Sequence, residues 1–166
     1  MADTVLLHPN RDKGESKATK AVVVLLLVVS ALLIAVVTLG GWSQLQGAQI
    51  VSFGYIVVYL VMAFFVSRWN RGVLPVAAAL AILLAVVAAV AGPAWFERDK
   101  AGFADPAIEP SILGLLTVIL VPVQILLIAF AMRGFQQQWN VEVEVPPDEA
   151  DRYQGGDHSL GRTQPA

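Results

Sequence analysis

Hydrophobic residues along the 166-residue chain gather into four long stretches that contain no charged side chain. Each stretch holds about 20 residues or more, the length that an α-helix needs to cross a hydrocarbon core of about 30 Å. Valine runs in the first stretch would favour strands in water, but a lone segment in lipid must satisfy its own backbone hydrogen bonds, so helix is predicted. The predicted spans are residues 21–41, 48–67, 72–95 and 111–132.

The composition supports a membrane protein. Hydrophobic residues make up 57% of the chain and charged residues 14%, whereas soluble domains average about 45–50% and about 25%. A soluble domain of this size needs a more polar exterior than these residues supply. We therefore expect an all-α integral membrane protein with four transmembrane helices. The short connection at residues 68–71 makes helix neighbours antiparallel, so an antiparallel bundle is predicted.

Three regions follow from this pattern. Residues 1–19 mix charges without an apolar stripe and are expected to form a flexible segment. Residues 20–132 form the transmembrane domain. Its first span is read as a retained anchor, because the apolar core is longer than the 7–15 residues of a signal peptide. Residues 133–166 form a tail that is expected to be largely disordered after residue 146, where Pro, Gly, Asp and Gln accumulate.

Lysine and arginine are distributed unevenly among the connections. The 42–47 connection has none, and in the 96–110 loop Arg98 and Lys100 are outweighed by four carboxylates. By the positive-inside rule both termini are expected in the cytoplasm, in a multi-pass plasma membrane protein. Richness in Ala, Val and Leu and short loops suit a bacterial inner membrane. The orienting residues are Lys13, Lys17, Lys20, Arg68, Arg71 and Arg133.

The four tryptophans all lie at or near the ends of predicted spans. Their amphipathic rings favour the headgroup level of a bilayer. We therefore expect interface anchors at Trp42, Trp69, Trp95 and Trp139.

The residue types exclude several kinds of chemistry. The chain has no cysteine, and its two histidines, His8 and His158, are far from the predicted spans. No Asp, Glu, Lys, Arg or His lies inside a span, so we predict no catalytic centre, no cofactor and no bound metal. The acidic 96–110 loop lacks the spacing of a calcium loop. A net charge of −2 without a strong basic cluster argues against nucleic acid.

Three uncharged polar residues lie near the centres of their spans: Ser30, Tyr59 and Gln124. An unpaired amide in lipid is costly, so Gln124 is expected to point inward and to bond Tyr59, Ser30 or a freed carbonyl. Pro122 removes one backbone hydrogen bond and predicts a kink. This cluster could be a small-ligand pocket or hinge, or it could link helices structurally; we favour the structural interpretation.

Two elements are candidates for partner contact. The third span carries a stripe of small residues that allows close helix approach, either within the chain or to another subunit; its members are Ala77, Ala81, Ala85, Ala88 and Gly92. The second candidate is the tail from Phe135 to Val145, whose residues 141–145 alternate Val and Glu. That alternation is typical of an extended linker or of an edge that adds to a partner's sheet.

These features predict a small membrane protein that is not an enzyme. The favoured function is an accessory or scaffolding subunit of a larger membrane complex, with lipid and other membrane subunits as its partners. The alternative is a homo-oligomeric pore or a carrier for a neutral or amphiphilic small molecule.

Overall fold

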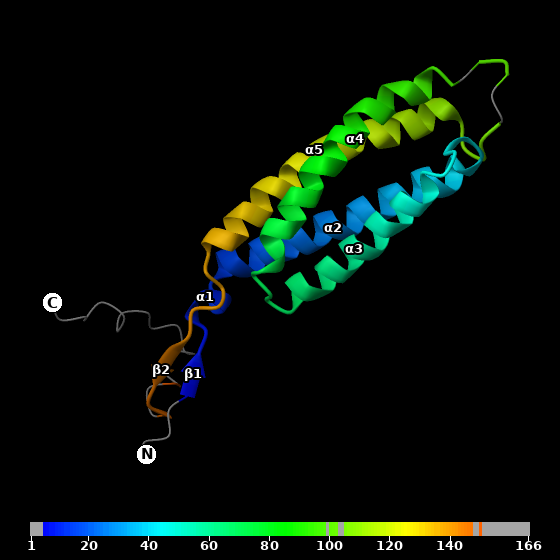
Figure 1. Cartoon of the computed structure of the whole chain (residues 1–166). Helices are drawn as coiled ribbons and strands as arrows, with labels where there is room; N and C mark the ends of the chain where they lie inside the picture. Colours follow the sequence, from blue (N-terminus) through cyan, green and yellow to red (C-terminus); the bar gives the residue numbers. More distant parts are fainter. Residues whose placement is uncertain (1–4, 99, 103–104, 148–149, 151–166) are drawn as a thin grey trace.

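The computed structural model describes residues 5–98, 100–102, 105–147 and 150. The described residues form four long helices, and Figure 1 shows a small sheet beyond one end of them. The helices are α2 (Gly14–Gly40), α3 (Gln49–Ser67), α4 (Val73–Phe96) and α5 (Pro110–Gln136). The shorter elements are β1 (Val5–Leu7), α1 (Pro9–Asp12), the 3-10 turn η1 (Trp42–Gln44) and β2 (Val143–Val145). The disorder predicted for the tail falls largely on residues 151–166, outside the described residues.

All four long helices are long and apolar enough to cross a membrane, by length and composition, and each coincides with most of one predicted span. Two helices are longer than the apolar stretches that predict them. Helix α2 already begins at Gly14, and α5 continues to Gln136. The extra turns are polar, and they are held by contacts with each other rather than by lipid. One such contact is the hydrogen bond from Gln137 Nε2 to Thr19 Oγ1, at 3.1 Å.

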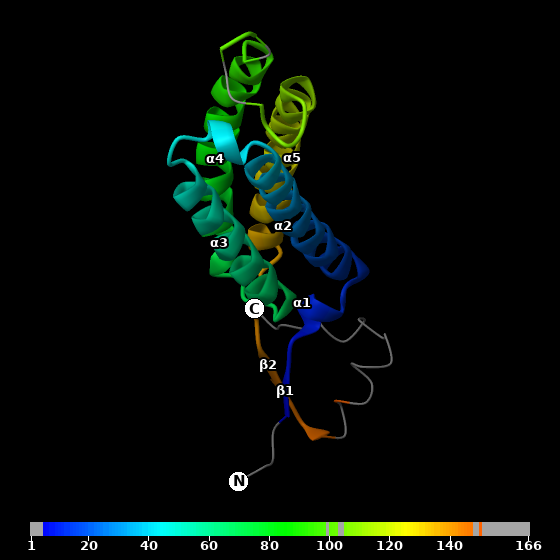
Figure 2. The same ribbon diagram turned by 90° about the vertical axis from the view of Figure 1, so that its right-hand side faces the viewer.

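Each long helix passes from one end of the helix bundle to the other, as Figures 1 and 2 show. Helix α2 packs against α3 and α5, and α4 packs against α5. At one end, Lys20 Nζ donates to Ser67 O at 3.4 Å. At the other end, Ile108 N donates to Gly40 O at 3.2 Å. The described ends of the chain and the α3–α4 turn thus share one end of the molecule, and η1 shares the opposite end with the 97–109 loop.

The stripe of small residues on α4 is used inside the chain. Its members Ala77, Ala81, Ala88 and Gly92 are buried. A Cβ atom added to Gly92 would lie 2.6 Å from Val118 Cγ2 on α5, so only glycine permits this approach. Of the two partners that the sequence leaves open for this stripe, the structure shows a helix of the same chain.

The four tryptophans predicted as interface anchors differ in burial. Trp95 is 3% exposed and Trp139 is fully buried, whereas Trp42 is about half exposed and Trp69 is half-buried. The ring of Trp95 lies against Gly41, where an added Cβ would clash with it. Proximity to a span end therefore did not distinguish a ring that faces lipid from one that fills a gap between helices.

The two described ends of the chain form a sheet with each other. The first segment was expected to be flexible, and residues 141–145 were expected to be a linker or an edge that adds to a partner's sheet. Strand β1 pairs antiparallel with β2, with Val5 opposite Val145 and Leu7 opposite Val143. The segment expected to be flexible thus supplies a strand, and the alternating tail pairs with it instead of remaining a linker. The apolar run at residues 5–7 is too short to predict a strand by itself, and its partner is more than 130 residues away in the chain.

We expect the α4–α5 contact to tolerate no side chain at Gly92. Gly92→Leu should lower the free energy of unfolding by about 1–3 kcal/mol, because the new side chain would overpack the contact with Val118. Gly54→Leu on α3 is the control, since a Cβ there meets nothing within 4 Å. Unfolding in mixed detergent and SDS measures both variants. Equal stability of the two would contradict close α4–α5 packing.

Candidate functional site

The three polar residues predicted near mid-membrane form one hydrogen-bonded chain. Tyr59 Oη on α3 donates to Gln124 Oε1 on α5 at 2.9 Å. Gln124 Nε2 donates to Ser30 Oγ on α2 at 2.8 Å, and Ser30 Oγ donates to Leu26 O at 2.7 Å. None of the three residues has exposed surface. This cluster joins three helices at a depth where water supplies no competing partner.

The geometry of this cluster is that of an interhelical link. The hydroxyl protons of Tyr59 and Ser30 are both donated inside the cluster, and the Gln124 carbonyl oxygen accepts from Tyr59. No charged side chain takes part in these hydrogen bonds. Helix α5 remains continuous through Pro122, two residues before Gln124. A kink at Pro122 stays a prediction.

A second polar region lies where the chain termini meet the helices. Trp139 packs edge-on against Trp69, with ring centroids 5.3 Å apart. Its Nε1 donates to Gln137 Oε1 at 3.0 Å, and its carbonyl accepts from Arg11 Nε at 3.0 Å. Lys20 Nζ lies 4.0 Å from the centroid of the Trp69 ring. Trp139 therefore anchors the tail to the ends of α2 and α3.

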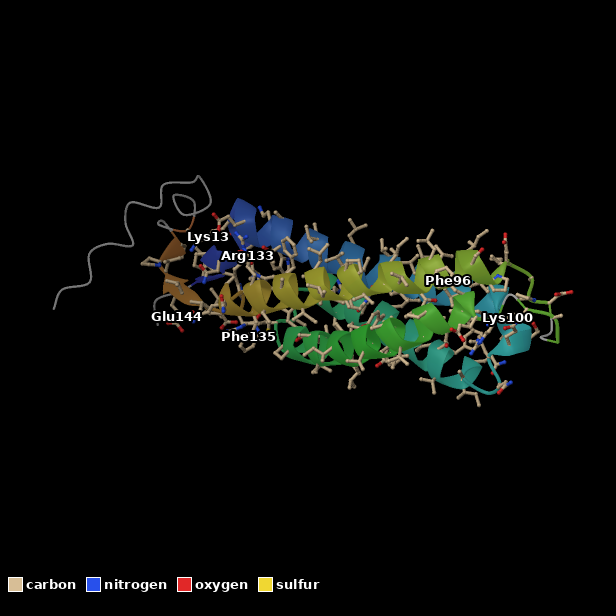
Figure 3. All side chains as sticks on the ribbon, turned by 90° about the horizontal axis from the view of Figure 1, so that it is seen from above. Lys13, Phe96, Lys100, Arg133, Phe135 and Glu144 are labelled. Carbon is tan, nitrogen blue, oxygen red and sulfur yellow. The ribbon has the colours of Figure 1, made fainter. Side chains whose placement is uncertain are left out.

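The residues that predicted orientation all lie at this same end. Lys17 Nζ is 3.9 Å from an Asp12 oxygen, and Arg133 is 3.8 Å from a Glu15 oxygen. Both pairs are largely exposed, so each stabilises the fold only weakly. Arg71 stacks over Phe135 at 4.2 Å. Figure 3 shows Lys13, Arg133 and Glu144 at this end, and Lys100 and Phe96 at the opposite end.

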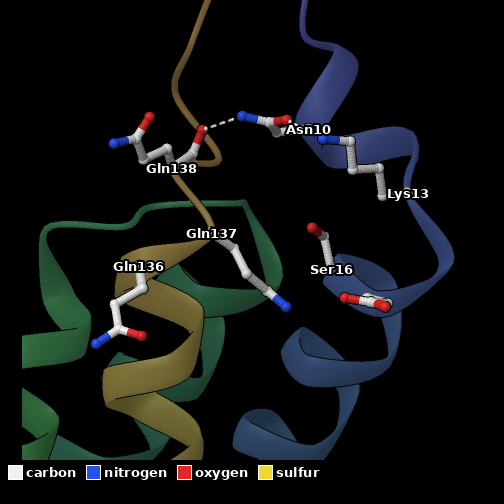
Figure 4. A pocket seen from close by; sticks show the side chains of 7 residues that line it. Asn10, Lys13, Ser16, Gln136, Gln137 and Gln138 are labelled. Carbon is white, nitrogen blue, oxygen red and sulfur yellow. Dashed lines mark hydrogen bonds between the residues drawn. The ribbon is translucent and has the colours of Figure 1, made fainter. Parts of the chain in front are cut away.

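A polar cavity of about 300 Å³ lies between the start of α2 and the end of α5. We call it the terminal cavity; Figure 4 shows the side chains that line it. Its wall is closed on one side by the hydrogen bond from Asn10 Nδ2 to Gln138 O, at 3.1 Å. It is lined by Asn10, Lys13, Glu15, Ser16, Gln136, Gln137 and Gln138.

Of these seven residues, Lys13 was predicted to orient the chain, and the three glutamines belong to the tail predicted to contact a partner. The run of three glutamines after Arg133 was the signal that could have drawn attention to them. A run of amides by itself predicts no site, because only the docking of the tail beside α2 encloses the space between them.

An apolar cavity of about 150 Å³ lies at the other end, among α2, α3, α4 and α5. Trp95, Leu84 and Leu120 are among its lining residues. Two of its hydroxyls bond within their own helices: Ser52 Oγ donates to Ala48 O and Thr117 Oγ1 donates to Leu113 O. Empty apolar cavities of this size stay dry and admit small hydrocarbons.

Among the residues that the structure describes, no group of three or more His, Cys, Asp or Glu could hold a metal ion. Comparisons of the chain with models of protein families, with curated proteins and with solved structures find no match. The arguments about function below therefore rest on the geometry of this chain.

We expect Tyr59 and Gln124 to be energetically coupled. Tyr59→Phe and Gln124→Leu should each cost about 0.6–1.7 kcal/mol of unfolding free energy, the range for hydrogen bonds between membrane helices. The double variant should cost less than the sum of the two, because it leaves no unpaired hydroxyl or amide. Ser52→Ala, which removes a bond within one helix, is the control. Strictly additive costs would show that the hydrogen bond contributes nothing.

Proposed function

We propose that the chain is an accessory or scaffolding subunit of a larger membrane complex, in a bacterial plasma membrane. Its four helices form an antiparallel bundle with both termini in the cytoplasm. The distribution of charge supports this orientation: Lys13, Lys20 and Arg71 lie at the end that carries both termini. Cationic residues remain preferentially on the cytoplasmic side during insertion.

One observation carries the proposed role, namely a sheet that lies beyond one end of the helices. The pair β1–β2 lies beyond the ends of the helices in Figures 1 and 2. Lipid covers apolar side chains on the helices, but it does not reach this sheet. Leu6 is nevertheless 54% exposed, and Val5 and Val141 are each 38% exposed. A two-stranded sheet alone is marginally stable in water.

An extended segment of a protein partner would complete such a sheet. Each outer edge of a two-stranded sheet presents backbone N–H and C=O groups that another strand can pair with. The added strand would also cover Leu6. The scaffold then consists of a membrane anchor made by four helices and a docking edge made by the chain's own ends. No step in this role requires a catalytic group.

A pore or a carrier remains the alternative, and one observation favours it: the apolar cavity beside Trp95. The polar cluster around Tyr59 and Gln124 offers little support for a pore or a carrier. The hydrogen bonds among Tyr59, Gln124 and Ser30 leave few polar atoms there for a ligand.

The orientation can be tested with single cysteines, because the chain has none of its own. A membrane-impermeant maleimide applied to intact cells should label Lys100→Cys, in the loop beyond α4. It should label Asn70→Cys, in the α3–α4 turn, only after the membrane is permeabilised. The reverse pattern would invert the orientation, and labelling of both in intact cells would contradict the four-span topology.

The docking edge can be tested by purification in mild detergent followed by mass spectrometry. The wild-type chain should be recovered with the subunits of a larger complex. Leu6→Lys should lose these subunits while remaining in the membrane, because a charge on the sheet opposes strand addition. Asn70→Lys adds the same charge at the same end, outside the sheet, and should keep them. Recovery of the wild-type chain alone, as a defined oligomer, would favour the alternative.

A further inference from the structure

We propose that the terminal cavity binds a phosphate group, carried by a phospholipid headgroup or free in solution. The proposal does not depend on the accessory role, because it concerns a different part of the molecule from the β1–β2 edge. It rests on four features of the cavity: a buried serine whose hydroxyl has no partner among the described residues, the start of a long helix, a local balance of charge, and the depth of the cavity relative to the membrane.

The first feature is Ser16, which is only 2% exposed. Its side chain lines the cavity, and Figure 4 shows its hydroxyl directed into the space beneath Asn10 and Gln138. No residue that the structure describes forms a hydrogen bond with this hydroxyl. The cavity therefore presents a donor to whatever occupies it.

The second feature is the amino-terminal end of α2, a helix of 27 residues. Ser16 belongs to its first turn, and no side chain caps that turn. The first turn of a helix carries backbone N–H groups without partners inside the helix, together with the positive end of the helix dipole. Both properties favour an anion at this position.

The third feature is the charge around the cavity. Lys13 Nζ donates to Asn10 Oδ1 at 2.8 Å, which uses one of its three protons and leaves two for a ligand. Glu15, the one acidic residue in the lining, lies 3.8 Å from Arg133. The charges of Lys13 and Glu15 cancel within the lining, and Arg133, which lies beside Glu15 outside the lining, gives the three residues together a net charge of +1. This balance matches the single negative charge of a phosphodiester.

The fourth feature is depth. Ser16 precedes the apolar stretch that begins at Ala21 by about 7.5 Å along the helix. The headgroup layer on each face of a bilayer is about 5–8 Å thick. A phosphate at the headgroup level could therefore enter the cavity while its acyl chains stay in the hydrocarbon. Basic pockets between helices on the cytoplasmic side are suited to this kind of headgroup.

Native mass spectrometry of the full chain in detergent, titrated with phosphatidylglycerol, tests the proposal. The wild-type protein should bind one lipid more tightly than the rest. Lys13→Gln should weaken this binding about tenfold, because a charged hydrogen bond is lost. Ser16→Ala should weaken it by a factor of about three. Lys17→Gln is the matched control: it removes the same charge from an exposed side chain outside the cavity, and should leave the affinity unchanged.

Two further probes identify the source of the phosphate. Diacylglycerol with the same acyl chains lacks phosphate and should not occupy the site. Inorganic phosphate that displaces the tight lipid would assign the site to phosphate in general, and failure to displace it would assign it to the lipid headgroup. Equal weakening by Lys13→Gln and Lys17→Gln would overturn the proposal, as would tight binding of diacylglycerol or no tightly bound phosphatidylglycerol.

Discussion

Lipid offers no hydrogen bond to a buried polar group, and the interior of this protein is arranged around that constraint. Ser30, Tyr59 and Gln124 satisfy one another across three helices. Thr117 bonds back to a carbonyl of its own helix. These four polar side chains thus form hydrogen bonds between helices or within one helix. Hydrogen bonds between helices specify which helix faces meet. Apolar side chains alone specify this poorly, because the surrounding lipid is equally apolar.

Van der Waals contact supplies the rest of the cohesion, and it depends on small residues. The stripe on α4 lets its backbone approach α5, with Gly92 against Val118. Helix α3 packs against α2 much more than against α4, and it leaves more of its surface to lipid than the other three helices. Where α4 and α5 meet the start of α3, the apolar cavity remains.

The end of the molecule that holds both termini carries the features on which function can be argued. Trp139, Gln137 and Arg11 bind the tail to the amino-terminal segment through side chains. This docking extends α2 and α5 beyond the hydrocarbon, positions β1 beside β2, and encloses the terminal cavity. The docking edge and the phosphate site are therefore both consequences of the same contact between the two ends of the chain.

The sequence by itself determined the four spans and their order, because a charge-free stretch of about 20 residues in lipid has no alternative to a helix. It also indicated Gln124 as an inward-pointing residue, since the cost of an unpaired amide in lipid depends on residue type alone. Only the tertiary structure decided which partner the stripe on α4 contacts, that Trp95 and Trp139 are buried, and that residues 5–7 pair with residues 143–145. These outcomes depend on contacts between segments far apart in the chain, and neither hydropathy nor local periodicity carries information about such contacts.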